Sequence, residues 1–377
     1  MLSKTRLVGR TPQLSMLDAE RRRAAGGSFR CVLLTGDAGL GKSRLASEFA
    51  RRAGRGTSVL LARAYPLGET APLGVWAEAL ESHLRNLPPA EIQRLSGGFL
   101  DDLAGLLRSI AAVRGWAPSQ DPPRARLLQG LAALLANMAT GSTVIVVMDD
   151  MHLADASSWE ALHYLARNLP GARVLLLVIA RTAELREHPV AGEILLGLEH
   201  DGSLRRVPLS ALPRDAIAEL ADDVLGRQAP AATVQWLSDH SRGNALFALS
   251  LLDALVEQEA DLTEPELRTL PETLAEAVHT QLRGFDDPAM ATLELLAVVG
   301  QRVELSDLAS LSARPLDRLT GILHRLVASR LVVEEERGRS LSYEIAHPLI
   351  QQVIAQSIGG ARRRSLHRLI ARALLAA

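Results

Sequence analysis

The chain has 377 residues, of which 47% are hydrophobic and 23% are charged, as in folded globular proteins. This length exceeds what one ordinary core accommodates, so more than one domain is expected. The formal net charge of −1 gives no overall attraction to nucleic acid or to an anionic membrane.

A single cysteine, Cys31, excludes a disulfide framework and a cysteine-based zinc site within the chain, and it fits a reducing compartment. No apolar run approaches the roughly 20 residues that cross a bilayer. The N-terminal "MLSKTRLVGR" also lacks an apolar signal core. We therefore expect a cytoplasmic protein with no membrane partner.

Strand and helix patterns alternate over residues 1–208. Short apolar runs predict buried strands at 31–35, 58–64, 143–150 and 173–181, with a weaker strand at 204–209. Helical patterns at 42–53, 74–86, 123–139 and 157–168 fall between them, and 66–130 is a long connection with helices of its own. This alternation predicts an α/β three-layer sandwich with a parallel sheet.

Strand patterns nearly stop after Pro208. Three helices, in "PRDAIAELADDVLG", "PAATVQWLSDHS" and "NALFALSLLDALVEQ", predict a small helical domain over 209–282. Helices at 288–299, 304–311 and 315–329, two strands around "ERGRS" and a helix at 348–358 are the parts of a winged-helix domain over 283–360. The last helix, 361–377, has an apolar stripe and no stop signal, so we expect it to begin a truncated helical region.

The stretch "LLTGDAGLGKSRLA" (33–46) contains the pattern G-x-x-x-x-G-K-[ST] at Gly36, Gly41, Lys42 and Ser43. Glycines allow a tight backbone whose N–H groups point at phosphate, and the following helix adds its positive N-terminal end. Lys42 would bind the β- and γ-phosphates, and the Ser43 hydroxyl would ligate Mg²⁺. Because an apolar strand precedes the loop and a helix follows, the sequence predicts a P-loop NTPase rather than a glycine-rich surface loop.

The stretch "VIVVMDDMHLAD" places two carboxylates at the end of a predicted strand, where ligands bind in such sheets. Asp149 would hold the Mg²⁺ shell, and Asp150 would orient or deprotonate the attacking water, or else serve as a structural carboxylate. His152 is either a packing residue or a catalyst. A catalytic glutamate is absent from this motif, which predicts slow hydrolysis.

Two further assignments follow from local pattern. Arg181 ends the fourth predicted strand, where its guanidinium could reach a γ-phosphate or form a surface ion pair. Ser157 and Glu160 fit a capping box at the start of the helix at 157–168.

In this order the motifs resemble the signal-transduction ATPases with numerous domains, an AAA-type class. They look most like the ATPase module of large ATP-binding LuxR-type transcriptional regulators. The resemblance rests on "LVGRTPQLSML", "GDAGLGKSRL", "DDMHLAD", "ART", "SRGNALFALSLLDAL" and "YEIAHPLIQQVI" and covers nearly the whole chain.

The resemblance implies that the helical and winged-helix domains act as lids on bound ATP or ADP. It implies nucleotide contacts near the adenine from Val8, Arg10 and Ala245, and at the diphosphate from His347. Along the loop it implies contacts from Gly36, Ala38, Gly39, Gly41, Lys42, Ser43 and Arg44. The catalytic set would be Lys42, Asp149, Asp150 and Arg181, with Ser43 and Asp149 on Mg²⁺.

Three positions depart from the family pattern: Gln13 stands for Glu, Leu153 for Trp and Ala245 for Pro. The last weakens the expected adenine contact. The resulting expectation is a slowly hydrolysing ATPase switch of a signal-responsive transcriptional regulator. Self-association or effector domains would be its partners, and DNA would bind only through a C-terminal domain that this chain lacks. The alternative is a nucleotide-stabilised interaction or DNA-binding module that does not hydrolyse ATP.

Overall fold

The computed structural model describes residues 5–54, 56–65, 72–115, 122–266, 271–329, 331–337 and 340–376. The chain divides into two compact units, Leu7–Ser210 and Ala211–Ala377, and the second also includes Met1–Arg6. Each unit has a sheet of its own. None of the helices in the described ranges is both long and apolar enough to span a bilayer.

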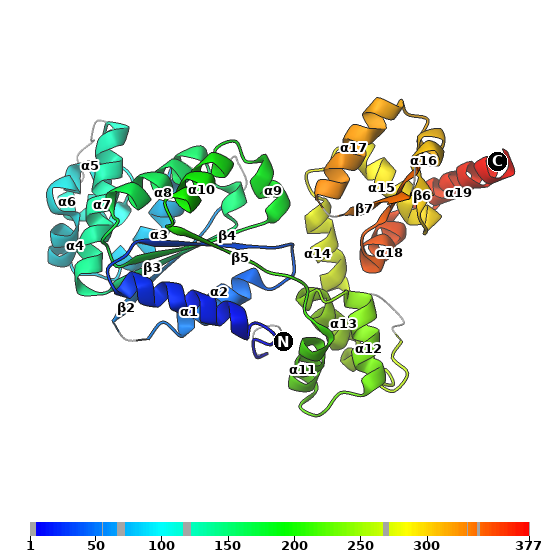
Figure 1. Cartoon of the computed structure of the whole chain (residues 1–377), viewed down its shortest axis with the longest axis horizontal. Coiled ribbons are helices and arrows are strands. Elements are labelled where there is room, and N and C mark those ends of the chain that lie inside the picture. The colour runs from blue at the N-terminus through cyan, green and yellow to red at the C-terminus, as the bar shows by residue number, and fades with distance from the viewer. Residues whose placement is uncertain are drawn as a thin grey trace. The chain divides into compact units, whose positions relative to one another are not determined.

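The unit Leu7–Ser210 is built on five parallel strands in the order β2-β3-β4-β1-β5, which confirms the predicted parallel α/β sheet (Figure 1). In chain order the strands are β1 Arg30–Thr35, β2 Thr57–Arg63, β3 Thr143–Asp149, β4 Val174–Ala180 and β5 Leu204–Pro208. The three central strands are buried on both faces, because helices cover the sheet from both sides.

Alternate side chains of these strands enter two separate apolar cores. On one face lie α1 (Thr11–Ala25) and α2 (Lys42–Arg51). The larger core, on the other face, includes residues of α3 Gly74–Leu84, α4 Pro89–Ser96, α5 Leu100–Ala104, α6 Arg108–Arg114, α7 Arg124–Gly141, α8 Ala156–Asn168, α9 Thr182–Glu187 and α10 Ala191–His200. Figure 1 shows α1 and α2 on one side of the sheet and α3, α7, α8 and α10 on the other.

The face covered by α1 and α2 is incomplete near the edge strand β2. Leu61 on β2 is 55% exposed, whereas Val147 and Ile179 on the neighbouring strands of the same face are buried. A cavity therefore remains beside α2, and it is bounded by β2, β3 and β4.

The unit that includes Ala211–Ala377 is mostly helical, with a small antiparallel sheet in the order β6-β8-β7. Its helices are α11 Arg214–Leu225, α12 Ala231–Ser241, α13 Ala245–Glu257, α14 Glu272–Leu282, α15 Asp287–Val299, α16 Leu305–Ser312, α17 Leu316–Ala328, α18 Pro348–Ser357 and α19 Gly360–Ala376. Its strands are β6 Val303–Glu304, β7 Val332–Arg337 and β8 Ser340–Ile345. The division of this unit into a helical and a winged-helix domain stays a prediction.

One local prediction is wrong. The capping box at Ser157 and Glu160 does not form, because α8 begins two residues earlier than that pattern requires. Its N-cap is Asp155, whose carboxylate accepts hydrogen bonds from the Ser158 N–H at 2.9 Å and the Ser158 hydroxyl at 2.6 Å. The helix α1 also carries no strong apolar stripe and was not among the predicted helices.

Candidate functional site

The loop between β1 and α2 turns tightly at its glycines. Gly36, Gly39 and Gly41 have positive φ angles of 152°, 79° and 88°. A β-carbon at Gly36 would lie 2.9 Å from the carbonyl oxygen of Leu209, so only glycine fits beside β5 at this point. No side chain caps the N-terminus of α2, which leaves the backbone N–H groups of its first turn facing the loop. This geometry suits an anionic phosphate group.

Lys42 begins α2 and is only 8% exposed. Its ammonium donates hydrogen bonds to the carbonyl oxygens of Gly36 at 2.8 Å and Asp37 at 2.7 Å. These bonds hold the charge inside the curve of the loop, where the spacing of the motif predicts it.

The charges around Lys42 identify its neighbours. Burial lowers the pKa of the Lys42 ammonium, and the positive charge of Arg181 lowers it further. The carboxylates of Asp150 and Asp149 act in the opposite direction and raise this pKa. The structure therefore brings together all four residues that the sequence predicts as catalytic, although they come from three different strand ends.

Ser43 and Asp149 line one cavity of about 220 Å³. Asp149 is the last residue of β3, and its Oδ1 accepts the N–H of Asp150 at 2.9 Å. A hydroxyl and a carboxylate are hard oxygen donors of the kind that Mg²⁺ prefers. Within the described ranges no cluster of three acidic, histidine or cysteine side chains could hold a metal alone. Such a donor set fits a nucleotide-bound Mg²⁺, which takes its other ligands from phosphate and water.

Asp150 has a positive φ of 53° and pairs with an arginine of the neighbouring strand. Its Oδ2 accepts from the Nη2 of Arg63 at 2.7 Å and from the Nε at 2.8 Å. The hydrogen bond from this carboxylate raises the pKa of Arg63. In this conformation the guanidinium neutralises the carboxylate that the sequence assigns to the attacking water.

Arg63 and Glu78 line the same cavity as Ser43 and Asp149, and sequence reasoning missed both. Arg63 ends β2 and lies in register with Asp149, and its N–H donates to Glu78 Oε2 at 3.4 Å. The order of strands, which places β2 beside β3, is the signal that would have found Arg63. Glu78 belongs to no motif.

Arg181 follows β4, which lies between β1 and β3 in the sheet. Its position therefore falls between the phosphate loop and the paired aspartates, as the sequence predicts. Its guanidinium pairs with Glu184 at 3.2 Å, and its N–H donates to His152 Nδ1 at 3.4 Å. Burial lowers the pKa of His152, so the ring is neutral near pH 7 and accepts this bond.

Arg10 joins the N-terminal segment to the phosphate loop. It is 3% exposed, and its Nη2 donates to the carbonyl oxygens of Leu40 at 3.0 Å and Ser210 at 2.8 Å. Burial lowers the pKa of its guanidinium. Val8 is half-buried in the same segment. The contacts with adenine that the resemblance implies for these two residues stay predictions, as do those of Ala38 and Arg44.

Ala245 and His347 belong to the other unit. Ala245 is the first residue of α13, and His347 is the N-cap of α18, where its Nδ1 accepts the N–H of Leu349 at 3.1 Å. The His347 ring is buried against Phe247, with ring centroids 5.0 Å apart, and burial lowers its pKa to about 4. Their predicted contacts with the nucleotide stay predictions.

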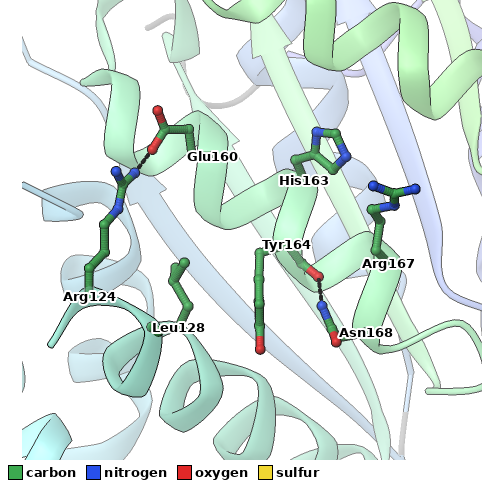
Figure 2. A pocket seen from close by; sticks show the side chains of 8 residues that line it. Arg124, Leu128, Glu160, His163, Tyr164, Arg167 and Asn168 are labelled. Atoms are coloured by element: carbon green, nitrogen blue, oxygen red, sulfur yellow. Dashed lines mark hydrogen bonds and ion pairs between the residues drawn. The ribbon is translucent and has the colours of Figure 1, made fainter.

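A second pocket, of about 570 Å³, lies between α7 and α8 and contains none of the predicted site residues. Figure 2 shows Arg124 turned toward Glu160, with which it forms an ion pair, and Leu128 and Tyr164 side by side. Because Arg124 and Glu160 neutralise each other, the pocket offers no charged pair for acid–base chemistry. We do not assign it to the candidate site.

Residues 6–179 match the model of the AAA ATPase domain. This match covers the phosphate loop, both aspartates and β4. Comparison with curated protein sequences gave no significant match.

Three solved structures illustrate the likeness in fold. A Walker-type ATPase of Pyrococcus abyssi is 15% identical with a TM-score of 0.58, covering 92% of this chain and 96% of its own. A signal transduction ATPase with a tetratricopeptide repeat sensor, from Pyrococcus horikoshii, is 16% identical with a TM-score of 0.39 over 99% of this chain and 46% of its own. A RuvB variant of Thermotoga maritima is 15% identical with a TM-score of 0.39 over 90% and 92%. The first supports a P-loop ATPase fold; the other two add no argument.

Proposed function

We propose that the chain is a slowly hydrolysing ATP/ADP switch. The observation that carries the proposal is the phosphate loop, with the buried ammonium of Lys42 beside a cavity lined by Ser43 and Asp149. The match of the AAA ATPase domain over 6–179 supports it independently.

The residue roles follow from position and charge. Lys42 and the N–H groups of the loop would bind the phosphates, and Ser43 and Asp149 would hold Mg²⁺. Bound Mg²⁺ supplies positive charge that stabilises the phosphoryl group during transfer. Arg181 lies near enough to Lys42 to affect its pKa, which supports a role on the terminal phosphate.

Slow turnover follows from the state of Asp150. A carboxylate that accepts two bonds from Arg63 is a weak acceptor for the proton of an attacking water. A slow reaction suits a switch, whose two nucleotide states must persist long enough to be distinguished.

The regulatory role rests on the resemblance alone. It places the module in a cytoplasmic transcriptional regulator, with Ala245 and His347 on a helical lid and a winged helix. Effector domains or self-association would pass on the nucleotide state, and DNA would be contacted by a domain outside this chain.

The alternative, a module that binds DNA without hydrolysis, has less support. Strand β7 carries Glu334, Glu335 and Glu336 in succession, and the first and last are exposed. Three adjacent carboxylates on the hairpin would repel the phosphates of DNA.

The test uses the purified chain. Denatured protein should release ADP or ATP on chromatography, or the emptied protein should bind ADP in a Mg²⁺-dependent titration, with phosphate release above a no-protein control. Absence of nucleotide in both measurements would reject the switch. Binding without phosphate release, together with a gel shift that weakens with salt, would favour the alternative.

A further inference from the structure

We propose that Glu78 is the second acidic residue of the Mg²⁺ site, a role that motif analysis gave to no residue outside "DDMHLAD". This inference rests on the proposed function, since it concerns the metal that accompanies the nucleotide. It assigns the water shell of the metal to Asp149 and Glu78, from opposite walls of one cavity.

The walls of the cavity carry the argument. Ser43 on α2, Asp149 on β3 and Glu78 on α3 all line the same space of about 220 Å³. Ser43 and Asp149 are the two predicted metal ligands. Glu78 is therefore the remaining carboxylate that faces the metal position, and it projects from the side of the edge strand.

Arg63 fixes Glu78 relative to Asp149. Its residue position is paired with Asp149 in the parallel ladder, and the N–H of the following residue, Ala64, donates to the Asp149 carbonyl at 2.9 Å. The N–H of Arg63 itself donates to Glu78 Oε2 at 3.4 Å. Two short links through β2 thus connect the carboxylate of Glu78 with the end of β3.

The same arginine excludes Asp150 from this task. Its guanidinium is bonded to Asp150 Oδ2 at 2.7 and 2.8 Å, so the charge of that carboxylate is balanced on the spot. Its N–H contacts Glu78 only through a long bond from the backbone, which leaves the negative charge of Glu78 for another partner. A divalent cation at Ser43 and Asp149 is that partner by charge and by donor type.

Helix α3 is held firmly enough for this role. Trp76 is fully buried, and its Nε1 donates to the Ser158 carbonyl at 3.0 Å. The N–H of Leu73 donates to Asp155 Oδ1 at 3.3 Å. Both acceptors follow β3 in the chain, so the first turns of α3 are fastened to the segment that carries Asp149. Glu81 of the same helix is used elsewhere and accepts from the Ser109 N–H at 3.1 Å.

Mg²⁺ is octahedral and retains several waters when it binds beside phosphates. Carboxylates near such a metal accept hydrogen bonds from these waters, and the loss of such a partner typically costs about tenfold or more in metal affinity. We expect Glu78 to act in this way rather than to displace a phosphate oxygen.

The experiment measures Mn²⁺ as a substitute for Mg²⁺ in the ADP complex. Free Mn²⁺ is counted by electron paramagnetic resonance during titration of the wild type, Glu78→Gln, Asp149→Asn and Glu193→Gln. Glu193 is an exposed carboxylate on α10 outside the cavity and serves as the matched control. Affinity for ADP without metal is measured in parallel with EDTA present.

We expect Glu78→Gln to weaken Mn²⁺ binding about tenfold, with ADP affinity in EDTA and thermal stability unchanged. Asp149→Asn should weaken it at least as much, and Glu193→Gln should match the wild type. Equal Mn²⁺ affinity in Glu78→Gln and Glu193→Gln, with Asp149→Asn impaired, would overturn the inference while the proposed function stands. Failure of the wild type to bind ADP at all would instead reject the proposed function.

Discussion

The two units use buried polar groups in opposite ways. In Leu7–Ser210, Lys42, Asp149, Asp150 and Arg181 gather at the carboxyl edge of a parallel sheet and affect one another's charge. In the unit that includes Ala211–Ala377, His347 is buried against an aromatic ring, and its Nε2 finds no hydrogen-bond partner among the described residues. The first arrangement attracts a charged ligand, whereas the second penalises a charge. Substitutions should therefore change ligand affinity in the first unit and stability in the second.

Removal of the loop ammonium should have the largest effect. We expect Lys42→Ala to weaken ADP binding by about a thousandfold or more, because a buried charge-assisted contact with phosphate is lost. Isothermal titration calorimetry measures it, and the exposed Arg51→Ala of the same helix is the control. Wild-type affinity in Lys42→Ala would show that the nucleotide site is misplaced.

A backbone substitution should expose the contrast in the second unit. Gly243 has a φ of 77°, and a β-carbon there would lie 2.4 Å from the Leu212 carbonyl oxygen. We expect Gly243→Ala to lower the free energy of unfolding by about 4 kcal/mol, from backbone strain together with overpacking. Gly226→Ala is the control, because its φ of 65° gives the same strain but no atom lies within 4 Å. It should cost about 1 kcal/mol in denaturant titration. Equal losses would mean that the clash relaxes freely.

The buried histidine should make the second unit sensitive to acid. Burial lowers the pKa of His347 to about 4, while the unfolded chain has an ordinary pKa of about 6.5. Between these values the unfolded state binds more protons, so stability is full above pH 6.5 and falls as the pH falls toward 4. The loss amounts to about 3 kcal/mol.

His347→Asn should flatten this dependence, since asparagine can keep the cap of α18 without titrating. The measurement is urea unfolding at a series of pH values. His324→Asn, at an exposed position of α17, should leave the slope unchanged. The same slope in His347→Asn and the wild type would contradict the assignment.

The ion pair beside the first site should give the smallest effect. Arg63→Ala removes the partner of Asp150, whose carboxylate could then accept a proton from water. We expect phosphate release to rise about threefold, a modest change because Arg63 is itself 60% exposed. Arg52→Ala, which removes an exposed ion pair on α2, is the comparison. A fall in rate would indicate that Arg63 holds Asp150 in its working position.

Much of the first unit could be predicted from sequence. Runs such as "VLLLVIA" are buried on both faces, so composition alone identifies them as strands, and the phosphate loop has a fixed spacing. Arg63 and Glu78 escaped prediction because their importance depends on which strands are neighbours. The N-cap at Asp155 was missed because two adjacent serines offered an equally good local pattern.

Arginine replaces lysine almost throughout this chain: lysine occurs only at positions 4 and 42. Lys42 is also the amine whose pKa is lowered by burial, and its ammonium is bonded to two loop carbonyls. Reductive methylation with carbon-13 formaldehyde would therefore label the loop with almost no background. The chemical shift of that methyl group would report directly whether ATP, ADP or neither is bound, in the full chain and without any substitution.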